Sequence, residues 1–146
     1  MSLFQSDTVM RRKSPPTPQA AGITAKAVFK YDFTQAFTAA SDLLEIGVLP
    51  ATAQLMGAEV IGVGLGAITA DIGLMDGEAG SRDETRTAGV ELFDDQSVNN
   101  ATASTATADC LAIAPEGIHR GIGVALSGNV AAGASKTLWL VIEYTY

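Results

Sequence analysis

A two-residue alternation of apolar and polar side chains runs through most of this chain and limits the folds open to it. The clearest instance is ITAKAVFKYDF at residues 23–33, where apolar side chains hold one parity and mostly polar ones the other. Successive side chains of a β-strand point to opposite faces of the sheet, so alternation of this length predicts a strand with one wet face.

Seven further segments show the same alternation, or a short apolar run closed by turn residues. They lie at residues 44–48, 58–65, 69–74, 87–92, 109–115, 121–126 and 136–146. Eight short strands separated by turn residues, with almost no stretch of helical period, predict an all-β sandwich or barrel. The one helical candidate, residues 34–44, would form a short turn at most. The polar tract at residues 97–109 is expected as a long loop or a weak edge strand rich in threonine.

The first 21 residues follow a different pattern, and we expect an extended arm there, ahead of a single domain at residues 22–146. Pro15, Pro16 and Pro18 fix φ and remove backbone donors, which excludes a helix. The arm is also basic, because Arg11, Arg12 and Lys13 stand next to these prolines. An irregular, basic, proline-rich segment can lie along a neighbouring molecule while losing relatively little chain entropy.

Charge divides the chain into a basic start and an acidic body. Residues 1–30 hold five basic side chains and one acidic one, whereas the remaining 116 residues hold four basic and fifteen acidic ones, for a formal net charge of −7. Binding to nucleic acid depends largely on Lys and Arg that neutralise phosphates, so we expect no nucleic-acid partner for the body. No membrane partner is expected either, because no apolar run approaches the roughly 18–20 residues that span a bilayer.

The basic cluster follows the weakly apolar start of the chain, which is the wrong order for a secretory signal, and no export signal is expected. The single cysteine, Cys110, excludes an internal disulfide framework and is compatible with synthesis in a reducing cytoplasm.

The glycine-rich stretch AEVIGVGLGAITADIGLMDG at residues 58–77 allows two interpretations. Gly62, Gly64 and Gly66 could cradle a dinucleotide phosphate, or they could form a corner between two strands. A dinucleotide site needs a helix directly after the glycines, whereas the residues after Gly66 alternate as a strand. We therefore expect a corner in the sheet.

No group of residues in the sequence predicts catalysis. His119 has only Glu116 as a near carboxylate, and Cys110 lies in a strand-like run, where a small buried side chain is the simplest interpretation. The carboxylates of DGEAGSRDET and of Asp94 and Asp95 lack the spacing of a calcium loop, which leaves a solvated acidic surface as the main interpretation and a weak divalent-cation site as the alternative. We predict no catalytic, cofactor-binding or metal-binding residue, and no enzyme.

Two features suggest self-association. Gly121, Gly123 and Ala125 place small residues along a strand, which suits close packing of a sheet or a subunit. Trp139 and Val141 lie opposite the face of Leu138, Leu140, Ile142, Tyr144 and Tyr146, so the last strand is apolar on both sides. Trp139 and Val141 are therefore candidates for a subunit interface, and the alternative is a central strand of the sandwich.

The ordered series of segments also carries a resemblance. LLEIGVLPATAQLMGAEV, ITADIGLMDGEAG, RTAGVELF, LAIAPEGIHRGIGVAL and GASKTLWLVIEYTY resemble a group of small structural proteins of tailed bacteriophages, commonly taken as head decoration, or cement, proteins. The resemblance covers residues 22–146. It rests on strand and turn residues, so it transfers no catalytic motif.

This resemblance implies an antiparallel β-sandwich of jelly-roll type with about eight strands, often assembled as a homotrimer on the capsid surface. It implies a virion protein whose partner is the major capsid protein and whose termini often make capsid contacts. For this chain we expect Arg11, Arg12 and Lys13, with Pro15 and Pro16, to form the capsid contact of the arm. The alternative is another virion component, such as a carbohydrate-binding module of a head fibre or tail.

Overall fold

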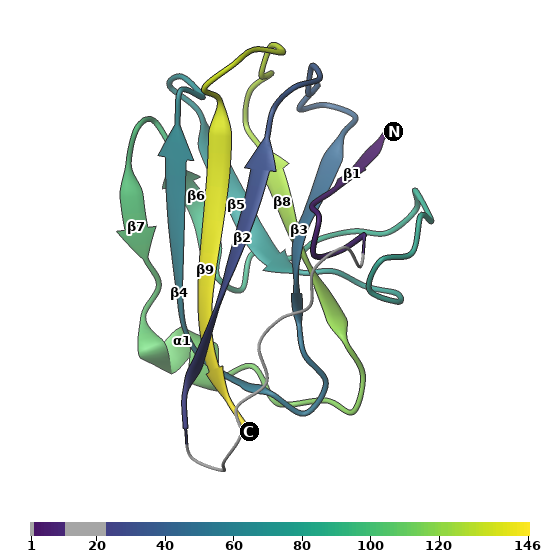
Figure 1. The fold of residues 1–146 in the computed structure, drawn as a ribbon, viewed down its shortest axis with the longest axis vertical. Helices are drawn as coiled ribbons and strands as arrows, with labels where there is room; N and C mark the ends of the chain where they lie inside the picture. The colour runs from purple at the N-terminus through teal and green to yellow at the C-terminus, as the bar shows by residue number, and fades with distance from the viewer. Residues whose placement is uncertain (1, 11–22) are drawn as a thin grey trace.

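The computed structural model describes residues 2–10 and 23–146, which fold into two β-sheets packed face to face (Figure 1). One sheet has five strands in the order β1-β3-β8-β5-β6, and the other has four in the order β2-β9-β4-β7. The strands are β1 (Leu3–Gln5), β2 (Ala25–Asp32), β3 (Leu43–Leu49), β4 (Gln54–Val63), β5 (Thr69–Leu74), β6 (Phe93–Ser97), β7 (Thr102–Ser104), β8 (Arg120–Leu126) and β9 (Thr137–Thr145). A short helix, α1, covers Thr107–Leu111.

The strand order is that of a jelly roll. Strands β2 to β9 supply two four-stranded antiparallel sheets, β3-β8-β5-β6 and β2-β9-β4-β7, and the chain crosses between them at most of its turns. Strand β1 is added at the edge of the first sheet, where it runs parallel to β3. The predicted all-β, jelly-roll sandwich of about eight strands is confirmed.

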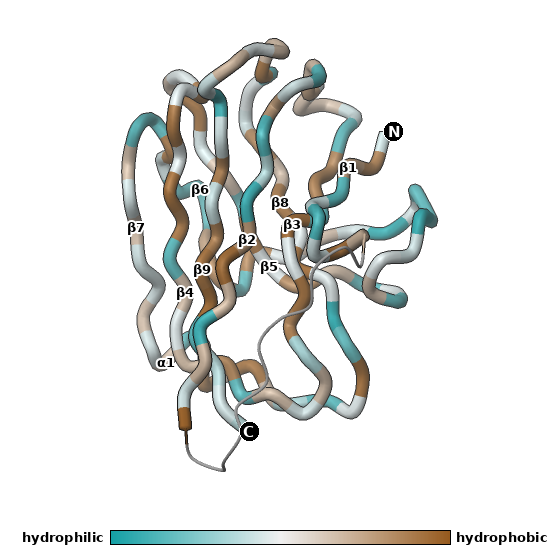
Figure 2. Tube along the Cα trace, viewed as in Figure 1, coloured by the Kyte–Doolittle hydropathy of each residue, from teal (hydrophilic) through white to brown (hydrophobic). Residues whose placement is uncertain are grey.

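The core lies between the sheets and follows the alternation seen in the sequence. In β9, Leu138, Leu140 and Ile142 point inward and are fully buried, and Phe29 of β2 lies opposite Leu140 in the register. Figure 2 shows hydrophobic positions recurring along these strands, whereas the connection between β5 and β6 is largely hydrophilic. Each such side chain stabilises the fold by about 1.5–3 kcal/mol through burial.

Two predicted strands are wrong. Residues 87–92 form no strand and contribute only an isolated bridge between Met75 and Ala88. Their apolar side chains do not share a buried face, since Val90 is 48% exposed while Leu92 is buried. The segment 109–115 was also expected as a strand. Its first three residues instead form the end of α1, where Cys110 is buried, and its remaining residues form no strand. Their places in the jelly roll are taken by β6 and by the threonine-rich edge strand β7.

The predicted arm at residues 1–21 is also wrong for its first part. Residues 3–5 form β1, and the ring of Phe4 packs against those of Tyr31 and Phe37, with centroids 6.1 and 5.6 Å apart. Further along, Val9 is buried. The start of the chain therefore belongs to the sandwich, because its apolar side chains complete the aromatic end of the core. Arg11, Arg12, Lys13, Pro15 and Pro16 lie outside the described residues.

Candidate functional site

The glycine-rich stretch forms the corner between β4 and β5. Gly64 and Gly66 have φ of +69° and +86°, which side chains rarely allow, and the Gly64 N–H donates to Oδ1 of Asn100 over 2.8 Å. β5 follows where a phosphate cradle would need the first turn of a helix, so the expected corner is confirmed and the dinucleotide interpretation is wrong.

The contacts of His119 and the burial of Cys110 are those of residues with a structural role. Nδ1 of His119 accepts a hydrogen bond from the backbone N–H of Ala51 over 3.0 Å, while Glu116 pairs with Arg120 at 3.6 Å. Burial, with the nearby charge of Asp109 adding to it, raises the pKa of the Cys110 thiol. At neutral pH this thiol stays protonated, which does not favour nucleophilic chemistry.

Within residues 2–10 and 23–146, no three His, Cys, Asp or Glu side chains come together as a potential metal site. Across the same part of the chain, no helix has the length and apolar character needed to cross a membrane.

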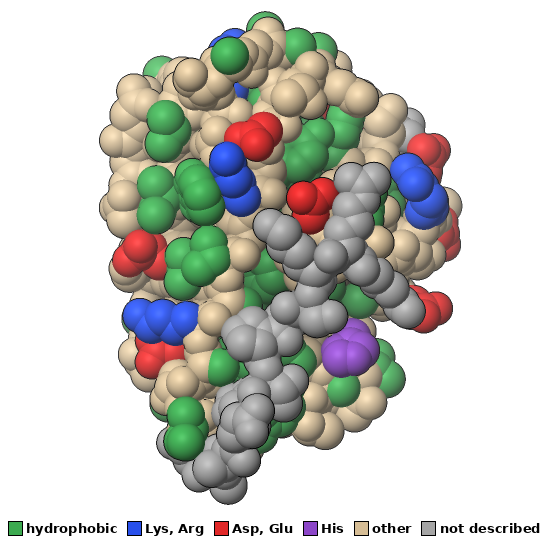
Figure 3. Space-filling model, viewed as in Figure 1, with side chains coloured by type: hydrophobic (Ala, Val, Ile, Leu, Met, Phe, Trp, Pro, Cys, Tyr) green, Lys and Arg blue, Asp and Glu red, His purple; other side chains and the backbone are tan. Residues whose placement is uncertain are grey.

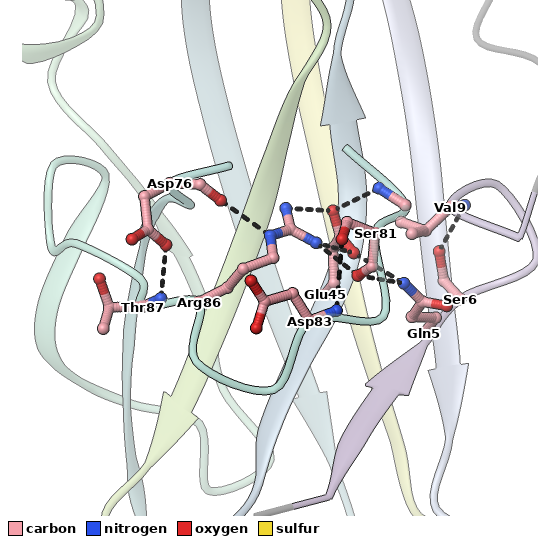
Figure 4. A network of polar contacts seen from close by, with 10 residues as sticks. Gln5, Ser6, Val9, Glu45, Asp76, Ser81, Asp83, Arg86 and Thr87 are labelled. Carbon is pink, nitrogen blue, oxygen red and sulfur yellow. Dashed lines mark hydrogen bonds and ion pairs between the residues drawn. The ribbon is translucent and has the colours of Figure 1, made fainter. Parts of the chain in front are cut away.

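A buried ion pair fixes the long β5–β6 connection, residues 75–92, to the five-stranded sheet (Figure 4). The Arg86 guanidinium binds the Glu45 carboxylate at two points, with Nη1–Oε2 and Nη2–Oε1 both 2.9 Å apart. The side chains retain 2% and 0% of their exposed surface. A bidentate arginine–carboxylate pair of this kind holds both partners in one geometry.

The remaining polar atoms of this pair are satisfied by neighbouring segments. Arg86 donates to the backbone oxygens of Asp76 and Ser81 over 2.8 and 2.9 Å, and the Gly80 N–H donates to Glu45 over 3.0 Å. From β1, Nε2 of Gln5 donates to Oε2 of Glu45 over 2.9 Å. One network therefore joins β1, β3 and the β5–β6 connection. It holds the start of the chain and this connection in one arrangement.

The small residues of β8 explain how this loop can lie on the sheet. A Cβ on Gly121 would stand 2.1 Å from Oε1 of Glu45, and one on Gly123 would stand 2.5 Å from Cβ of Ala88. Gly121 thus lies against the Glu45–Arg86 pair and Gly123 against Met75 and Ala88 of the loop, which accounts for these two glycines without a second subunit.

The sequence analysis missed the Glu45–Arg86 pair. Glu45 counted only as a polar position in the alternation of residues 44–48, and no role was assigned to Arg86. The available signal was a single Glu within the otherwise apolar segment LLEIGVL, combined with glycines in β8 that leave room for a covering segment.

The structure places Trp139 and Val141 on the outer face of the four-stranded sheet, both half-buried. By hydrogen bonding, β9 is a central strand between β2 and β4, as the alternative held. Nζ of Lys30 lies 5.0 Å from the centroid of the Trp139 ring. Their role in a subunit interface stays a prediction.

Beside Val141 the same face carries an open hollow of about 360 Å³. The bulge in β4 between Leu55 and Gly57 opens it, because Gly57 leaves space that a side chain would fill. The hollow is lined chiefly by Lys26, Met56, Glu59, Ser104, Val141 and Glu143. It therefore combines an apolar wall with two carboxylates and one ammonium group.

The architecture is that of a jelly-roll protein that presents sheet faces and an anchored loop to its surroundings. A scan against protein-family models finds no match, and a search of the curated proteins finds none either. Among solved structures, a chain in the capsid of Ralstonia phage GP4 is 30% identical, with a TM-score of 0.87 over 99% of this chain and 97% of that one.

Two further phage structures share the fold. A chain in the cyanophage Pam1 capsid asymmetric unit is 20% identical, with a TM-score of 0.59 and 92% of each chain covered. A chain in the acid-stable capsid of Helicobacter pylori bacteriophage KHP30 is 10% identical, with a TM-score of 0.53, and the match covers 87% of this chain and 90% of that one. The protein belongs to the family of phage capsid proteins that the Ralstonia phage GP4 chain represents, and it is a structural component of the virion.

Proposed function

We propose that this protein is a head decoration, or cement, protein that binds the outer surface of a phage capsid and stabilises the head. The observation that carries the proposal is the match to a capsid chain over nearly its whole length, without an inserted or missing domain. Among residues 2–10 and 23–146, no segment covers the outer face of the four-stranded sheet, and a jelly roll of this kind with a firmly held loop suits a protein that acts by binding through its surfaces.

The arm supplies the main capsid contact in this proposal. Three consecutive cations, Arg11, Arg12 and Lys13, follow directly after Met10. The Met10 N–H donates to the Ser6 oxygen over 3.0 Å, and β1 is held by the Glu45 network. Met10, which directly precedes the basic cluster, is therefore held in place by these contacts. We assign the cluster to acidic groups of the major capsid protein, with Pro15 and Pro16 limiting the freedom of the segment.

Self-association is the second part of the proposal. We assign Trp139 and Val141 to a subunit interface, with a homotrimer as the expected assembly. Apolar side chains that stay accessible on a sheet face favour burial against another protein surface.

The carbohydrate-binding alternative has weaker support. The only tryptophan lies on the outer face, but the Lys30 ammonium stands over its ring, and a stacked sugar would have to displace it. A specific hit on a glycan array would favour this alternative over capsid decoration.

The arm assignment is tested by charge reversal. Particles that lack the protein are incubated with wild type, with Arg11→Glu/Arg12→Glu/Lys13→Glu, or with the control Arg82→Glu, which changes a charge on an exposed loop. We expect the triple variant to lose at least about tenfold in occupancy, most strongly at low salt, and the control to bind like wild type. Unchanged occupancy of the triple variant would contradict the assignment.

A further inference from the structure

The tip of the β5–β6 connection, residues 77–85, is bordered by a part of the chain that lies far from it in the sequence. Nε2 of Gln5 in β1 donates to the backbone oxygen of Ser81 over 3.4 Å, in addition to its bond to Glu45. Gly80 lies close to Val9, because a Cβ added to this glycine would stand 3.2 Å from the Val9 backbone oxygen. Residues 5–9 therefore lie along one side of the tip (Figure 4).

The two ends of the same connection are fixed by other contacts. The Met75 N–H donates to the Gly121 oxygen over 2.8 Å, and the Gly89 N–H donates to the Leu74 oxygen over 3.0 Å. These bonds join the ends to β8 and β5 and do not involve residues 2–10. Residues 82–85 at the tip are exposed, and Figure 3 shows basic and acidic side chains together on this projecting segment, at the right of the view.

Glu45 links the tip to β1, since its carboxylate accepts hydrogen bonds from both. Oε2 accepts from Gln5, Oε1 accepts from the Gly80 N–H, and Arg86 binds both oxygens. Gln5 is the register neighbour of Glu45 at the edge of the sheet, so its departure opens that flank of the carboxylate to water. An ion pair that water reaches contributes little, whereas a buried bidentate pair fixes its partners in one geometry. Loss of β1 therefore weakens the contact that holds the tip.

β1 can leave the sheet without disturbing the strands of the jelly roll. It has three residues, lies at the edge, and pairs only with β3. Its half-buried Phe4 ring packs against the rings of Tyr31 and Phe37. Short segments near a chain terminus open locally at a lower free energy than the whole fold.

We propose that residues 2–10 act as a strap, a segment whose docking sets the position of the tip. While the strap is docked, the tip is held by Glu45 and by residues 5–9. When a partner draws the strap off the sandwich, water reaches Glu45 and the tip is released. Such coupling is reciprocal, so release of the tip also loosens the strap.

The sequence shows where a partner can act on the strap. The chain continues from Met10 directly into the basic cluster at residues 11–13, so a protein that binds this cluster pulls on the strap itself. The inference goes beyond the proposed function and does not depend on it, because the strap is a property of the isolated protein.

Hydrogen exchange followed by NMR, on the full chain and without capsids, tests the strap. Phe4→Ala removes the ring that anchors the strap and leaves every residue of the Glu45 network in place. The Gly80 and Arg86 amides should exchange at least about fivefold faster than in wild type, while the amides of β9 keep their wild-type rates. Trp139→Ala, which removes a half-buried ring on the other sheet, is the control and should leave the Gly80 and Arg86 amides unchanged.

A second variant tests the coupling from the side of the connection. Gly80→Ala places a side chain at a φ of +82° and 3.2 Å from the Val9 oxygen, which strains the tip against the strap. The Ser6 N–H, which donates to the Glu45 backbone oxygen over 3.1 Å, should then exchange at least about fivefold faster.

Two results would overturn the strap directly: wild-type exchange of the Gly80 amide in Phe4→Ala, or wild-type exchange of the Ser6 amide in Gly80→Ala. Exchange that becomes equally faster in β9 would show that Phe4 acts on the whole sandwich, and would overturn it as well. No capsid is present in these measurements, so failure of the proposed decoration function is a separate result.

Discussion

Glu45 carries a carboxylate with no exposed surface, and Arg86 is what makes that position tolerable. The ion pair, the Gly80 N–H and Gln5 together replace the water that the carboxylate loses on folding. Removing one partner of such a pair leaves an uncompensated buried charge, which is more destabilising than the pair itself is stabilising.

Arg86→Met should therefore lower the free energy of unfolding by about 3–5 kcal/mol. The matched control is Arg82→Met, the same chemical change at an exposed position four residues earlier, for which we expect about 0.5 kcal/mol or less. Urea denaturation followed by circular dichroism measures both. Equal midpoints for the two variants would show that the pair does not hold the loop.

The buried Tyr144 makes the stability of the protein fall at alkaline pH. Burial, and secondarily the neighbouring Tyr146, raises the pKa of Tyr144 to about 12, against about 10 in an unfolded chain. The unfolded state loses this proton first, so stability is complete below pH 10 and falls as the pH rises from about 10 to about 12.

The denaturation midpoint should accordingly fall less steeply over this pH range in Tyr144→Phe than in wild type, whatever the variant's stability at pH 8. Tyr146→Phe is the control: it leaves Tyr144 buried and removes only the smaller contribution to its raised pKa, so this variant should keep most of the wild-type slope. Parallel slopes for wild type and Tyr144→Phe would refute this account.

At the level of elements, the glycines of β8 set where the β5–β6 connection can lie. A Cβ on Gly123 would meet Cγ of Met75 at 2.7 Å and Cβ of Ala88 at 2.5 Å, whereas one on Gly57 in β4 would meet only Cβ of Glu143 at 4.0 Å. Gly123→Ala should destabilise the protein by about 1–3 kcal/mol and raise the rate of proteolysis in residues 75–92. Gly57→Ala should leave both within error, and equal effects of the two substitutions would contradict loop packing on β8.

Most elements could be predicted from alternation because a strand between a core and solvent records its two faces in its side chains. Residues 23–33 and 136–146 are such cases, and they became β2 and β9. Residues 87–92 were mistaken for a strand because apolar side chains alternate in their sequence, whereas in the structure Val90 is 48% exposed and only Leu92 of this segment is buried. Residues 109–115 were likewise mistaken for a strand because a short apolar run has no period that separates a strand from one turn of helix.

The contacts of the site were less accessible to sequence analysis than the strands. Trp139 and Val141 could be placed on the outward side of the last strand by parity alone. The Glu45–Arg86 pair could not, because it joins residues 41 positions apart and depends on how a long connection folds back. Likewise, the pairing of β1 with β3 is a parallel contact of three residues, too short to leave a pattern.

For the whole molecule, the resemblance to tailed-phage head proteins and the structural match to a capsid chain agree on a virion component. The uneven distribution of charge along the chain suggests how the molecule is oriented on the capsid in the decoration model. Residues 1–30 hold five basic side chains and one acidic one, whereas residues 31–146 hold four basic and fifteen acidic ones. In the decoration model, the arm faces the shell and the acidic body faces solvent.

Cryo-electron microscopy of intact particles tests this central claim most directly. The account predicts density for the nine-stranded sandwich on the outer surface of the head, with the segment after Met10 directed into the shell, and loss of that density from particles made without the protein. Density inside the shell or confined to the tail would contradict it.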